Sequence, residues 1–422
     1  MCRATTGNAK TMPAIALPYG DDILAMREGL DAFLRAEVLT RHAKHEALLG
    51  DPRRKFGEDG RYSDAAQELI EDVRLASARA GYYAICVPEA MGGGGMGMLA
   101  YFAFWERLFH VCGAKYWLGH FAGSHWSKGP SRVLDGLTPS LRERLLPDLM
   151  AGRTSLCFAL SEPGAGSDAM AIRTRAEPDG DGWRLSGSKI WTTNSPHADY
   201  AMVFAVTDPE AAAKRRGGIS LFLVPTNAPG FRREGVIRMW GSPGSDEAML
   251  YFDGVRLERE QLVGELGKGF RTAMLGVGLG RLYNAARSVG MARWALEMAF
   301  DYAKQRETFG KPIAEYQGVT FPLAESAMEI HAAHLMGLNV AQLLDQGLRA
   351  TKELSMAKAY AVEAAARAVD RAMQTHGAMG FTNEMYLTDA YVMMRKINVA
   401  DGTNEILRRA IARAMLEGDV DL

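Results

Sequence analysis

The sequence predicts a mainly α-helical protein with a β domain in the middle of the chain. Apolar residues follow a helical period over residues 21–150 and again from about residue 266 to the end. Between these regions, short β-rich runs alternate with Gly, Pro, Asp and Asn clusters. With 422 residues the chain is long enough for two or three domains that each bury a core. We therefore expect an N-terminal helical domain, a middle β domain and a C-terminal helical domain, at residues 1–154, 155–264 and 265–422.

The N-terminal region reads as a series of helices. Between Asp21 and Leu39, apolar side chains recur at helical spacing. A second helix is expected over residues 64–80. A third is expected over residues 98–109, where the sequence MLAYFAFWERLF is apolar almost all round. A helix of that composition belongs deep inside a protein.

The middle region contains five short β-rich runs: TSLCFAL, GWRLSGSKIWTT, DYAMVFAVT, ISLFLVPT and EAMLYFDGVRL. Their length, and the turn residues between them, predict a compact antiparallel sheet or barrel. From residue 266 onward, long helical patterns return, with two of them at about 315–346 and 351–377. A last helix follows Asp401. Long helices joined by short connectors predict an antiparallel bundle.

Composition excludes several classes of function. The formal net charge is −1, which gives no support for nucleic acid as a partner. The four scattered cysteines have no CxxC spacing and the histidines form no HExxH pattern, so we expect free thiols and no metal site. No apolar stretch reaches the roughly 20 residues of a membrane span, and the N-terminus lacks an apolar signal core. These features indicate a cytoplasmic enzyme with no membrane span.

Residues 92–97, GGGGMG, match the glycine pattern of dinucleotide-binding loops. That interpretation requires an acidic residue about 20 positions later, to hold the ribose. No Asp or Glu occurs between Arg107 and Leu134, and the flanking chain is helical. A glycine turn between a loop and a packed helix is the preferred interpretation.

Two segments of the β region have features of a ligand site. In FALSEPGAGSD, residues 158–168, glycines flank an alanine, so backbone N–H groups can approach a ligand closely. In KIWTTNSPHADY, residues 189–200, an indole beside two hydroxyls can lie along a flat aromatic cofactor. Taken singly, the first is equally compatible with a structural turn and the second with an ordinary strand.

Two segments of the C-terminal region also carry ligand-type residues. In QRETFGKPIAEYQG, residues 305–318, Arg306 could pair with a pyrophosphate. In QTHGAMGF, residues 374–381, glycines at a helix end allow close backbone approach. Each is also compatible with a plain helix connection.

Together and in this order, these stretches resemble the acyl-CoA dehydrogenase family of flavoproteins. The similarity runs from about residue 25 to 417, and includes VPEAMGG at 87–93 and FLVPTNAPGF at 222–231. The resemblance implies an N-terminal helical domain, a middle antiparallel β-barrel or sandwich and a C-terminal four-helix bundle. It also implies FAD as cofactor, an acyl-CoA substrate, a homotetramer built as a dimer of dimers, and an electron-transferring flavoprotein as electron acceptor.

The resemblance further implies roles for individual residues. Ser161 and Thr193 would hydrogen-bond the polar edge of the isoalloxazine. Residues of the bundle would reach the FAD of the neighbouring subunit. The implied cofactor-binding residues are Phe158, Leu160, Ser161, Trp191, Thr193, Arg306, Thr308, Phe309, Gln317, Gln374, Thr375, Gly377, Ala378, Thr403 and Glu405, and the implied substrate-binding residues are Ser167, Arg281 and Gly402.

Asp401 is the candidate catalytic base. In the family a carboxylate removes the α-proton while the β-hydrogen leaves as hydride to flavin N5. Many members place a glutamate where this chain has Asp401, and others place their base on a bundle helix, at the position of Gly280 beside Arg281. Glycine cannot act as a base, which leaves Asp401. The alternative is that Asp401 only caps the last helix.

Two departures from the family pattern bear on the substrate. Gly278 stands where members often have an acidic residue for the pantetheine chain, so we expect altered contacts to CoA. The segment 116–126, with Tyr116, Trp117, His120 and Trp126, falls where members line the acyl end of the pocket. Its bulky, partly polar residues favour a short, branched, cyclic or functionalised acyl group.

Two other classes of function remain open at the level of sequence. One is different chemistry on the same fold, such as a nitroalkane oxidase-like enzyme, which also uses Asp at this place, or a flavin monooxygenase. The other is a non-enzymatic flavoprotein or a nucleic-acid binder of this fold, which the near-neutral charge disfavours.

Overall fold

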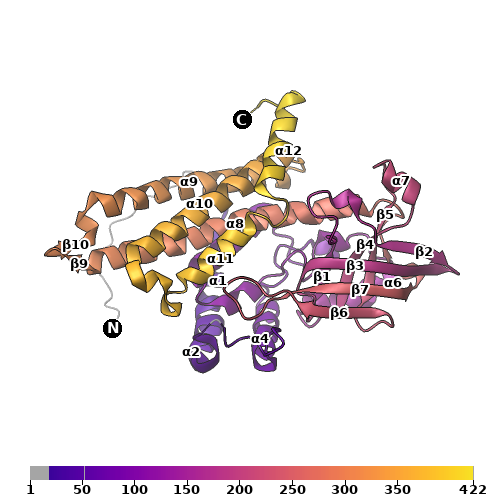
Figure 1. The fold of residues 1–422 in the computed structure, drawn as a ribbon, viewed down its shortest axis with the longest axis horizontal. Coiled ribbons are helices and arrows are strands. Elements are labelled where there is room, and N and C mark those ends of the chain that lie inside the picture. Colours follow the sequence, from indigo (N-terminus) through magenta and orange to yellow (C-terminus); the bar gives the residue numbers. More distant parts are fainter. Residues whose placement is uncertain (1–18, 52, 422) are drawn as a thin grey trace.

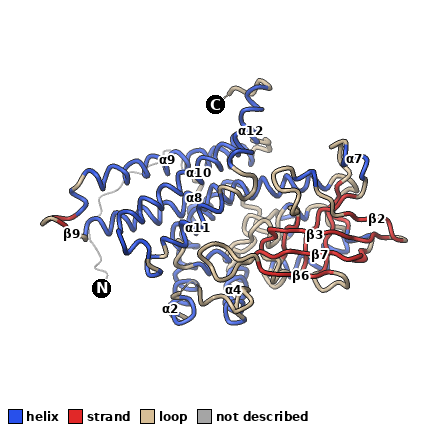
Figure 2. The backbone as a smooth tube through the Cα atoms, in the orientation of Figure 1, coloured by secondary structure: helices blue, strands red, loops and turns tan. Residues whose placement is uncertain are grey.

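The structure is a computed structural model that describes residues 19–51 and 53–421. The N-terminal segment considered for a signal sequence, and with it the start of the predicted first domain, lies outside the described residues. Figure 1 shows an elongated molecule, with a bundle of long helices at one end and a sheet at the other. Shorter helices pack beneath the place where the two meet. The predicted order of helical, β and helical regions is confirmed (Figure 2).

The N-terminal helices assemble around α5 (Gly97–Cys112), which contacts both α1 and α8. Phe102, Phe104 and Trp105 are at most 2% exposed, so the apolar run is buried as its sequence predicts. The other helices of this region are α1 (Asp21–Phe33), a π-helical segment (Leu34–Leu39), α2 (Thr40–Lys44), α3 (Glu46–Leu49), α4 (Asp64–Arg79) and α6 (Pro139–Met150).

The middle region folds into one eight-stranded sheet. Its strands are β1 (Leu156–Ala159), β2 (Arg175–Asp179), β3 (Gly182–Thr193), β4 (Tyr200–Val206), β5 (Ile219–Pro225), β6 (Phe231–Val236), β7 (Glu247–Leu257) and β8 (Leu262–Val263), with the short helix α7 (Pro209–Ala213) between β4 and β5. The strand order is β6-β7-β3-β2-β4-β5-β8, and β1 pairs with β4.

The sheet is mixed, which corrects the expectation of purely antiparallel strands. β1 lies parallel to β4 over four residue pairs, and β2 meets β4 in parallel at one pair. Neither strand is joined to β4 by a hairpin, so no tight turn imposes an antiparallel arrangement. Within the described residues the strand path does not close on itself, so the sheet is not a closed barrel.

The C-terminal region is a bundle of long helices. α8 (Gly269–Gln305), α9 (Gln317–Asp345) and α10 (Thr351–His376) pack against one another, and α11 (Leu387–Ile397) packs on α10. α12 (Asn404–Leu416) projects from the bundle and leads to the C-terminus (Figure 1). A small hairpin, β9 (Glu307–Thr308) and β10 (Lys311–Pro312), joins α8 to α9 at the end of the bundle that lies away from the sheet.

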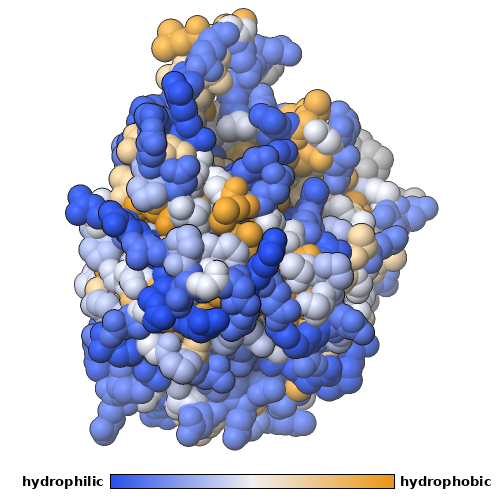
Figure 3. Space-filling view, turned by 90° about the vertical axis from the view of Figure 1, so that its right-hand side faces the viewer, coloured by the Kyte–Doolittle hydropathy of each residue, from blue (hydrophilic) through white to orange (hydrophobic). Residues whose placement is uncertain are grey.

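The connections between the three regions are short loops. One lies between α6 and β1 and contains the proposed boundary at 154/155, and the other lies between β8 and α8 and contains the proposed boundary at 264/265. The face at the sheet end is largely hydrophilic, with scattered apolar groups (Figure 3). No helix among residues 19–51 and 53–421 combines the length and apolar character needed to cross a bilayer.

Candidate active site

Asp401 lies in the loop between α11 and α12 and is held against α8 from two sides. Its Oδ2 accepts a hydrogen bond of 2.7 Å from Nδ2 of Asn284, and its backbone carbonyl accepts one of 3.1 Å from Nε of Arg281. The backbone at Asp401 is left-handed, with φ +52°, a conformation that residues with a Cβ seldom adopt. Strain of this kind persists where the surrounding contacts impose it.

The cap of α12 is Thr403, not Asp401. The Oγ1 of Thr403 accepts a hydrogen bond of 3.3 Å from the backbone N–H of Ile406. The alternative interpretation of Asp401 as a mere helix cap is therefore wrong. The Asp401 carboxylate is free to serve another purpose, and Thr403, implied as a cofactor ligand, has a structural role of its own.

Gly280 makes room for the Asp401 side chain. A Cβ at position 280 would lie 2.4 Å from Oδ2 of Asp401 and 2.8 Å from Nε1 of Trp126. One turn earlier, a Cβ at Gly276 would lie 2.8 Å from the Trp126 ring. Gly278 points elsewhere, since a Cβ there would meet only Cδ2 of Leu354, at 3.8 Å. The glycine run therefore packs Trp126 and Asp401 closely onto α8.

Burial raises the pKa of Asp401 above the ordinary aspartate value of 3.8. The positive charge of Arg287 is the strongest influence in the opposite direction, followed by Lys358 and Arg281 and then the Asn284 hydrogen bond. Lys358 itself donates to the carbonyl of Gly402 over 3.1 Å, and burial lowers its pKa to about 8. A carboxyl group with a raised pKa beside a cavity is a candidate for proton transfer.

A large cavity, of about 580 Å³, opens beside Asp401. Its walls come from all three regions: the N-terminal helices, the loops beside the sheet, and α8 with α11. Thr193, implied as a flavin contact, lines the same cavity as Asp401. The sequence analysis assigned both residues to one ligand site. In the structure both line this cavity, although they are far apart in the chain.

The segment 116–126 contributes much of the cavity wall. Trp117, His120 and Trp126, which the sequence analysis assigned to the acyl end of the pocket, line the cavity. Tyr116 does not line it, because its ring packs edge-on against His42, with 5.1 Å between the ring centroids. Burial lowers the pKa of His120 to about 3, so this ring is neutral near pH 7.

The cavity is more polar than the sequence suggested. Lys128 pairs with Asp246 at 2.6 Å, and Lys396 pairs with Glu247 at 2.5 Å. None of these four residues, nor Asn284 and Arg287, was identified from the sequence. Only Asn284 and Arg287 had a pattern in the sequence that could have revealed them. Gly280, Asn284 and Arg287 are spaced i, i+4, i+7 on one helix, so they share a face of α8.

The loop after β1 is fixed by a buried ion pair. Nζ of Lys189 donates to Oε1 of Glu162 at 2.8 Å and to the carbonyl of Leu160 at 3.0 Å. The Glu162 carboxylate also accepts from the backbone N–H groups of Arg173 and Thr174, at 2.6 and 2.9 Å. The backbone N–H of Ile190 donates to the carbonyl of Ser161. Ser161 and strand β3, which carries Trp191 and Thr193, are thereby held in register.

The implied cofactor residues fall into two groups that lie far apart in one chain. Phe158, Leu160, Ser161, Trp191 and Thr193 lie at the sheet, whereas Arg306, Thr308, Phe309, Gln317, Gln374, Thr375, Gly377 and Ala378 lie around the opposite end of the bundle (Figure 1). The remaining two, Thr403 and Glu405, lie at the start of α12, beside Asp401. Trp191 is 55% exposed and Phe309 96% exposed. Of the implied substrate residues, Arg281 and Gly402 adjoin Asp401, whereas Ser167 lies exposed on the loop after β1.

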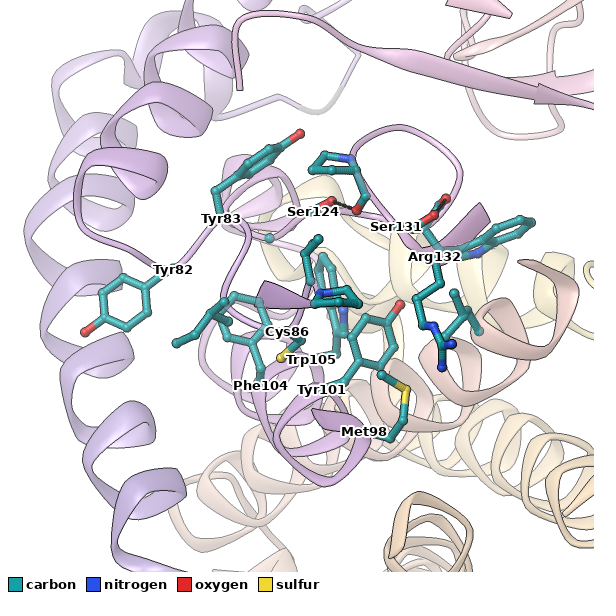
Figure 4. A pocket seen from close by; sticks show the side chains of 17 residues that line it. Tyr82, Tyr83, Cys86, Met98, Tyr101, Phe104, Trp105, Ser124, Ser131 and Arg132 are labelled. Atoms are coloured by element: carbon teal, nitrogen blue, oxygen red, sulfur yellow. Dashed lines mark hydrogen bonds between the residues drawn. The ribbon is translucent and has the colours of Figure 1, made fainter. Parts of the chain in front are cut away.

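A second, small cavity of about 30 Å³ is lined in part by Trp126, and Figure 4 shows its surroundings. Tyr101, Cys86 and Ser124 surround it, and Ser124 donates a hydrogen bond of 2.7 Å to the carbonyl of Pro130. Tyr83, Gly123 and Trp126 line both cavities and so form the wall between them. The small cavity has room for a few atoms only, which leaves the large one as the candidate substrate site.

Comparison with known proteins finds related sequences over most of the chain. Family models described as the N-terminal, middle and C-terminal domains of acyl-CoA dehydrogenase match residues 21–153, 157–255 and 267–416. The chain is 37% identical to the human mitochondrial short-chain specific acyl-CoA dehydrogenase, over 88% of this chain and 90% of that one. It is 32% identical to a subunit of the caffeyl-CoA reductase-Etf complex of Acetobacterium woodii, over 86% of this chain and 97% of the relative.

A solved structure of high similarity is that of an acyl-CoA dehydrogenase from Geobacillus kaustophilus. It superposes with a TM-score of 0.82 at 28% identity, and the superposition covers 95% of this chain and 100% of that one.

Proposed function

The chain belongs to the acyl-CoA dehydrogenase family of oxidoreductases, and from this premise we propose that it catalyses FAD-dependent α,β-dehydrogenation of an acyl-CoA thioester. The observation that carries the proposal is the position of Asp401: it lines the large cavity together with Thr193, and Gly280 leaves no competing base on α8. In this proposal the Asp401 carboxylate accepts the α-proton of the thioester.

The residues around the loop after β1 fit a flavin. Gly164 and Gly166 have nothing within 4 Å of the place where a Cβ would stand, so the loop backbone is open to a ligand. Thr193 offers a hydroxyl within the cavity, and Trp191, at φ +60°, presents an exposed indole beside it. When bound, FAD supplies a hydride acceptor for the substrate β-carbon.

Residues of the chain position the proton acceptor. Asn284 engages Oδ2 of Asp401, and Arg281 fixes the backbone carbonyl of the same residue. A base held at both its side chain and its backbone loses little freedom when the substrate binds. Burial raises the pKa of Asp401, which strengthens it as a base, while the nearby cations favour its ionised form.

The walls of the cavity support a cyclic or functionalised acyl group over a short straight one. Trp117, Phe121 and Tyr283 contribute aromatic surface to the cavity wall. Packing against aromatic side chains suits rings. The Acetobacterium relative is named for a caffeyl thioester, whose acyl group is an aryl propenoyl group. We therefore place ring-containing or polar acyl groups first among the candidates.

The division of the cofactor residues between two ends of the molecule supports an oligomer. Within one chain the two groups lie at opposite ends of the molecule (Figure 1), so a second copy would be needed to bring both to the same FAD. Phe321, Met328 and Leu335 stand seven residues apart on α9 and are 59%, 66% and 38% exposed. An apolar stripe of this kind on a bundle helix suits burial against another subunit. We propose a homotetramer in which FAD is shared between chains.

An electron-transferring flavoprotein is the proposed electron acceptor. The support is the name of the Acetobacterium relative, which is a subunit of a complex with such a protein. Exposure of Trp191 at the sheet end would leave that side of the flavin site near the surface.

Flavin absorbance tests the proposed function. Purified protein is mixed without oxygen first with a panel of acyl-CoA thioesters and then with nitroalkanes. Bleaching of the flavin by at least one thioester is expected. Bleaching by nitroalkanes alone would favour the nitroalkane oxidase-like alternative, and the absence of bleaching by every compound would contradict a redox function with either class.

A further inference from the structure

The large cavity contains several hydrogen-bond donors that have no acceptor among the described residues. Among the residues that line this cavity, the buried N–H donors without a partner include Nε1 of Trp117, Nε1 of Trp126, Nε of Arg74 and Nε of Arg287; Nε2 of His197 and the acceptor Oδ1 of Asn284 are also unpartnered. A buried donor that stays unpaired costs free energy, and native sites seldom keep several unless a ligand or water pairs with them. The cavity is therefore suited to a ligand that offers several acceptor oxygens.

His125 adds another donor to the same space. Its Nδ1 accepts from the backbone N–H of Ser127 at 3.2 Å, so the proton of the neutral ring resides on Nε2. Burial holds the pKa of His125 well below the usual value, which keeps the ring neutral. The Tyr283 ring packs edge-on against it, with 4.5 Å between centroids. His125 thus contributes a neutral N–H group to the cavity wall.

Arg287 is the unpaired cation nearest the reacting end. Lys128 and Lys396 are each matched by a carboxylate of the chain, but Arg287 has no ion pair or hydrogen bond within the described residues. Its guanidinium lies over the Tyr283 ring, 4.8 Å from the centroid. It is the charge that acts most strongly on Asp401, yet the Asp401 carboxylate bonds to Asn284 instead. Arg287 therefore lines the cavity with guanidinium N–H groups that are available to a ligand.

We propose that the acyl group of the substrate carries a carboxylate, which the guanidinium of Arg287 binds. This inference rests on the proposed function, since it assigns a part of the same substrate. A carboxylate offers two acceptor oxygens that match the planar fork of arginine, whereas a hydroxyl would leave the charge uncompensated. Nε1 of Trp126, which adjoins Asp401, provides a further donor for such an oxygen-bearing group.

The position of Arg287 on α8 sets an approximate length for the acyl group. Asn284, which holds the base, precedes it by three residues on the same helix face, which is a rise of about 4.5 Å. A carboxylate bound by Arg287 would then lie a few carbon atoms beyond the α-carbon. Monothioesters of dicarboxylic acids with about five carbons, or ring-containing equivalents, match this spacing.

The test compares three thioesters of equal chain length: glutaryl-CoA, its ω-amide and pentanoyl-CoA. Anaerobic flavin reduction is followed against thioester concentration for the wild-type holoenzyme and for Arg287→Gln. We expect the wild type to favour glutaryl-CoA. In the variant, efficiency with glutaryl-CoA should fall roughly 30- to 1000-fold, mainly through a higher half-saturating concentration. The amide and pentanoyl thioesters should change far less, and Arg287→Lys should restore part of the loss.

The comparison within one variant separates binding from an effect on the base. Loss of the Arg287 charge also changes the pKa of Asp401, but that change acts on all three thioesters alike. Arg144→Gln, which removes an exposed guanidinium from α6, is the matched control and should leave all rates unchanged. Calorimetric titration of glutaryl-CoA into the Asp401→Asn holoenzyme, with and without Arg287→Gln, measures binding without turnover.

Three outcomes would overturn the proposal. One is an equal fall with all three thioesters, and another is a wild-type preference for pentanoyl-CoA. The third is loss of the glutaryl preference in Lys55→Gln or Arg74→Gln, two other cavity cations that have no ion pair among the described residues, but not in Arg287→Gln. Reduction by neutral thioesters would still support the proposed function in each case. Failure of every thioester to reduce the flavin would instead contradict the proposed function itself.

Discussion

Asn284 donates a hydrogen bond of 2.7 Å to Oδ2 of Asp401, and so joins α8 to a loop 117 positions further along the chain. The same face of α8 carries Gly280, which leaves space for that carboxylate. Helix α8 thus supplies the hydrogen bond, the space and, through Arg287, the strongest opposing charge for the proposed base.

Gly280→Ala should displace Asp401. The new Cβ would lie 2.4 Å from Oδ2 of Asp401, a contact that neighbouring atoms must relieve by moving. Overpacking of this kind costs about 1–3 kcal/mol of stability, and a shift of the base by 1 Å can slow the reaction roughly 100-fold. Gly278→Ala is the control, because its Cβ meets only Leu354 at 3.8 Å. Equal flavin-reduction rates in the two variants would show that packing at Gly280 does not position the base.

The rate of flavin reduction should depend on pH through Asp401. A protonated Asp401 cannot accept a proton, so the rate should fall as pH falls through its pKa, which burial raises above 3.8. Asn284→Ala removes a hydrogen bond that favours the ionised form, so the falling limb should move to higher pH. Stopped-flow measurement of the pH–rate profile checks both statements. An unchanged profile in Asn284→Ala would contradict the assignment of the limb to Asp401.

The free energy of unfolding should also depend on pH through the titration of Asp401. Between 3.8 and its raised pKa, Asp401 binds a proton in the folded state that the unfolded state has already lost. Its contribution therefore favours folding at low pH and is lost as pH rises through this window. Asp401→Asn lacks this dependence, so denaturation of variant and wild type across the window should show the variant gaining relative stability as pH rises.

The ion pair between Lys189 and Glu162 should be important for both stability and flavin retention. Both side chains are buried, and Lys189 also holds the carbonyl of Leu160. Lys189→Met leaves the Glu162 carboxylate without its cation, which should cost roughly 3–5 kcal/mol and loosen bound FAD. The double variant Lys189→Met/Glu162→Gln should recover part of that loss. Denaturant unfolding and the ratio of flavin to protein absorbance measure the two effects. A double variant that is no better than the single one would argue against uncompensated charge as the cause.

A substitution that breaks the contact between subunits should also release FAD. Met328→Glu places a charge within the exposed apolar stripe of α9 and should break the proposed contact between subunits. Leu24→Glu, at an exposed apolar position on α1, is the control. Size-exclusion chromatography with light scattering, combined with flavin content, should show a smaller, FAD-poor species only for Met328→Glu. A monomeric variant with full FAD would contradict the shared cofactor site.

Periodicity in the sequence was enough to predict the architecture. The helices expected at 315–346 and 351–377 correspond to α9 and α10 within two residues at each end. Apolar composition alone indicated the burial of α5. The parallel pairing of β1 with β4 was missed because strand patterns report burial, and carry no information on the direction of a partner that no hairpin connects.

The candidate site was only partly predictable. Asp401 was found because it stands within a recognisable motif at a glycine turn. The pair of Lys128 and Asp246, 118 positions apart, left no local pattern from which contact could be inferred. Asn284 and Arg287 share a helix face with Gly280. Their spacing points to the site only after Asp401 is known to lie against that helix. Contacts made by the tertiary fold, rather than by spacing, therefore account for most of what was missed.

The most direct test of the central claim is anaerobic flavin reduction by a thioester substrate in Asp401→Asn. Asparagine keeps the size of the side chain but cannot accept the α-proton, so the variant should retain FAD and reduce it slower by roughly 100- to 10,000-fold, the usual contribution of a general base. A variant that retains FAD and reduces it at the wild-type rate would contradict the assignment of Asp401 as the base.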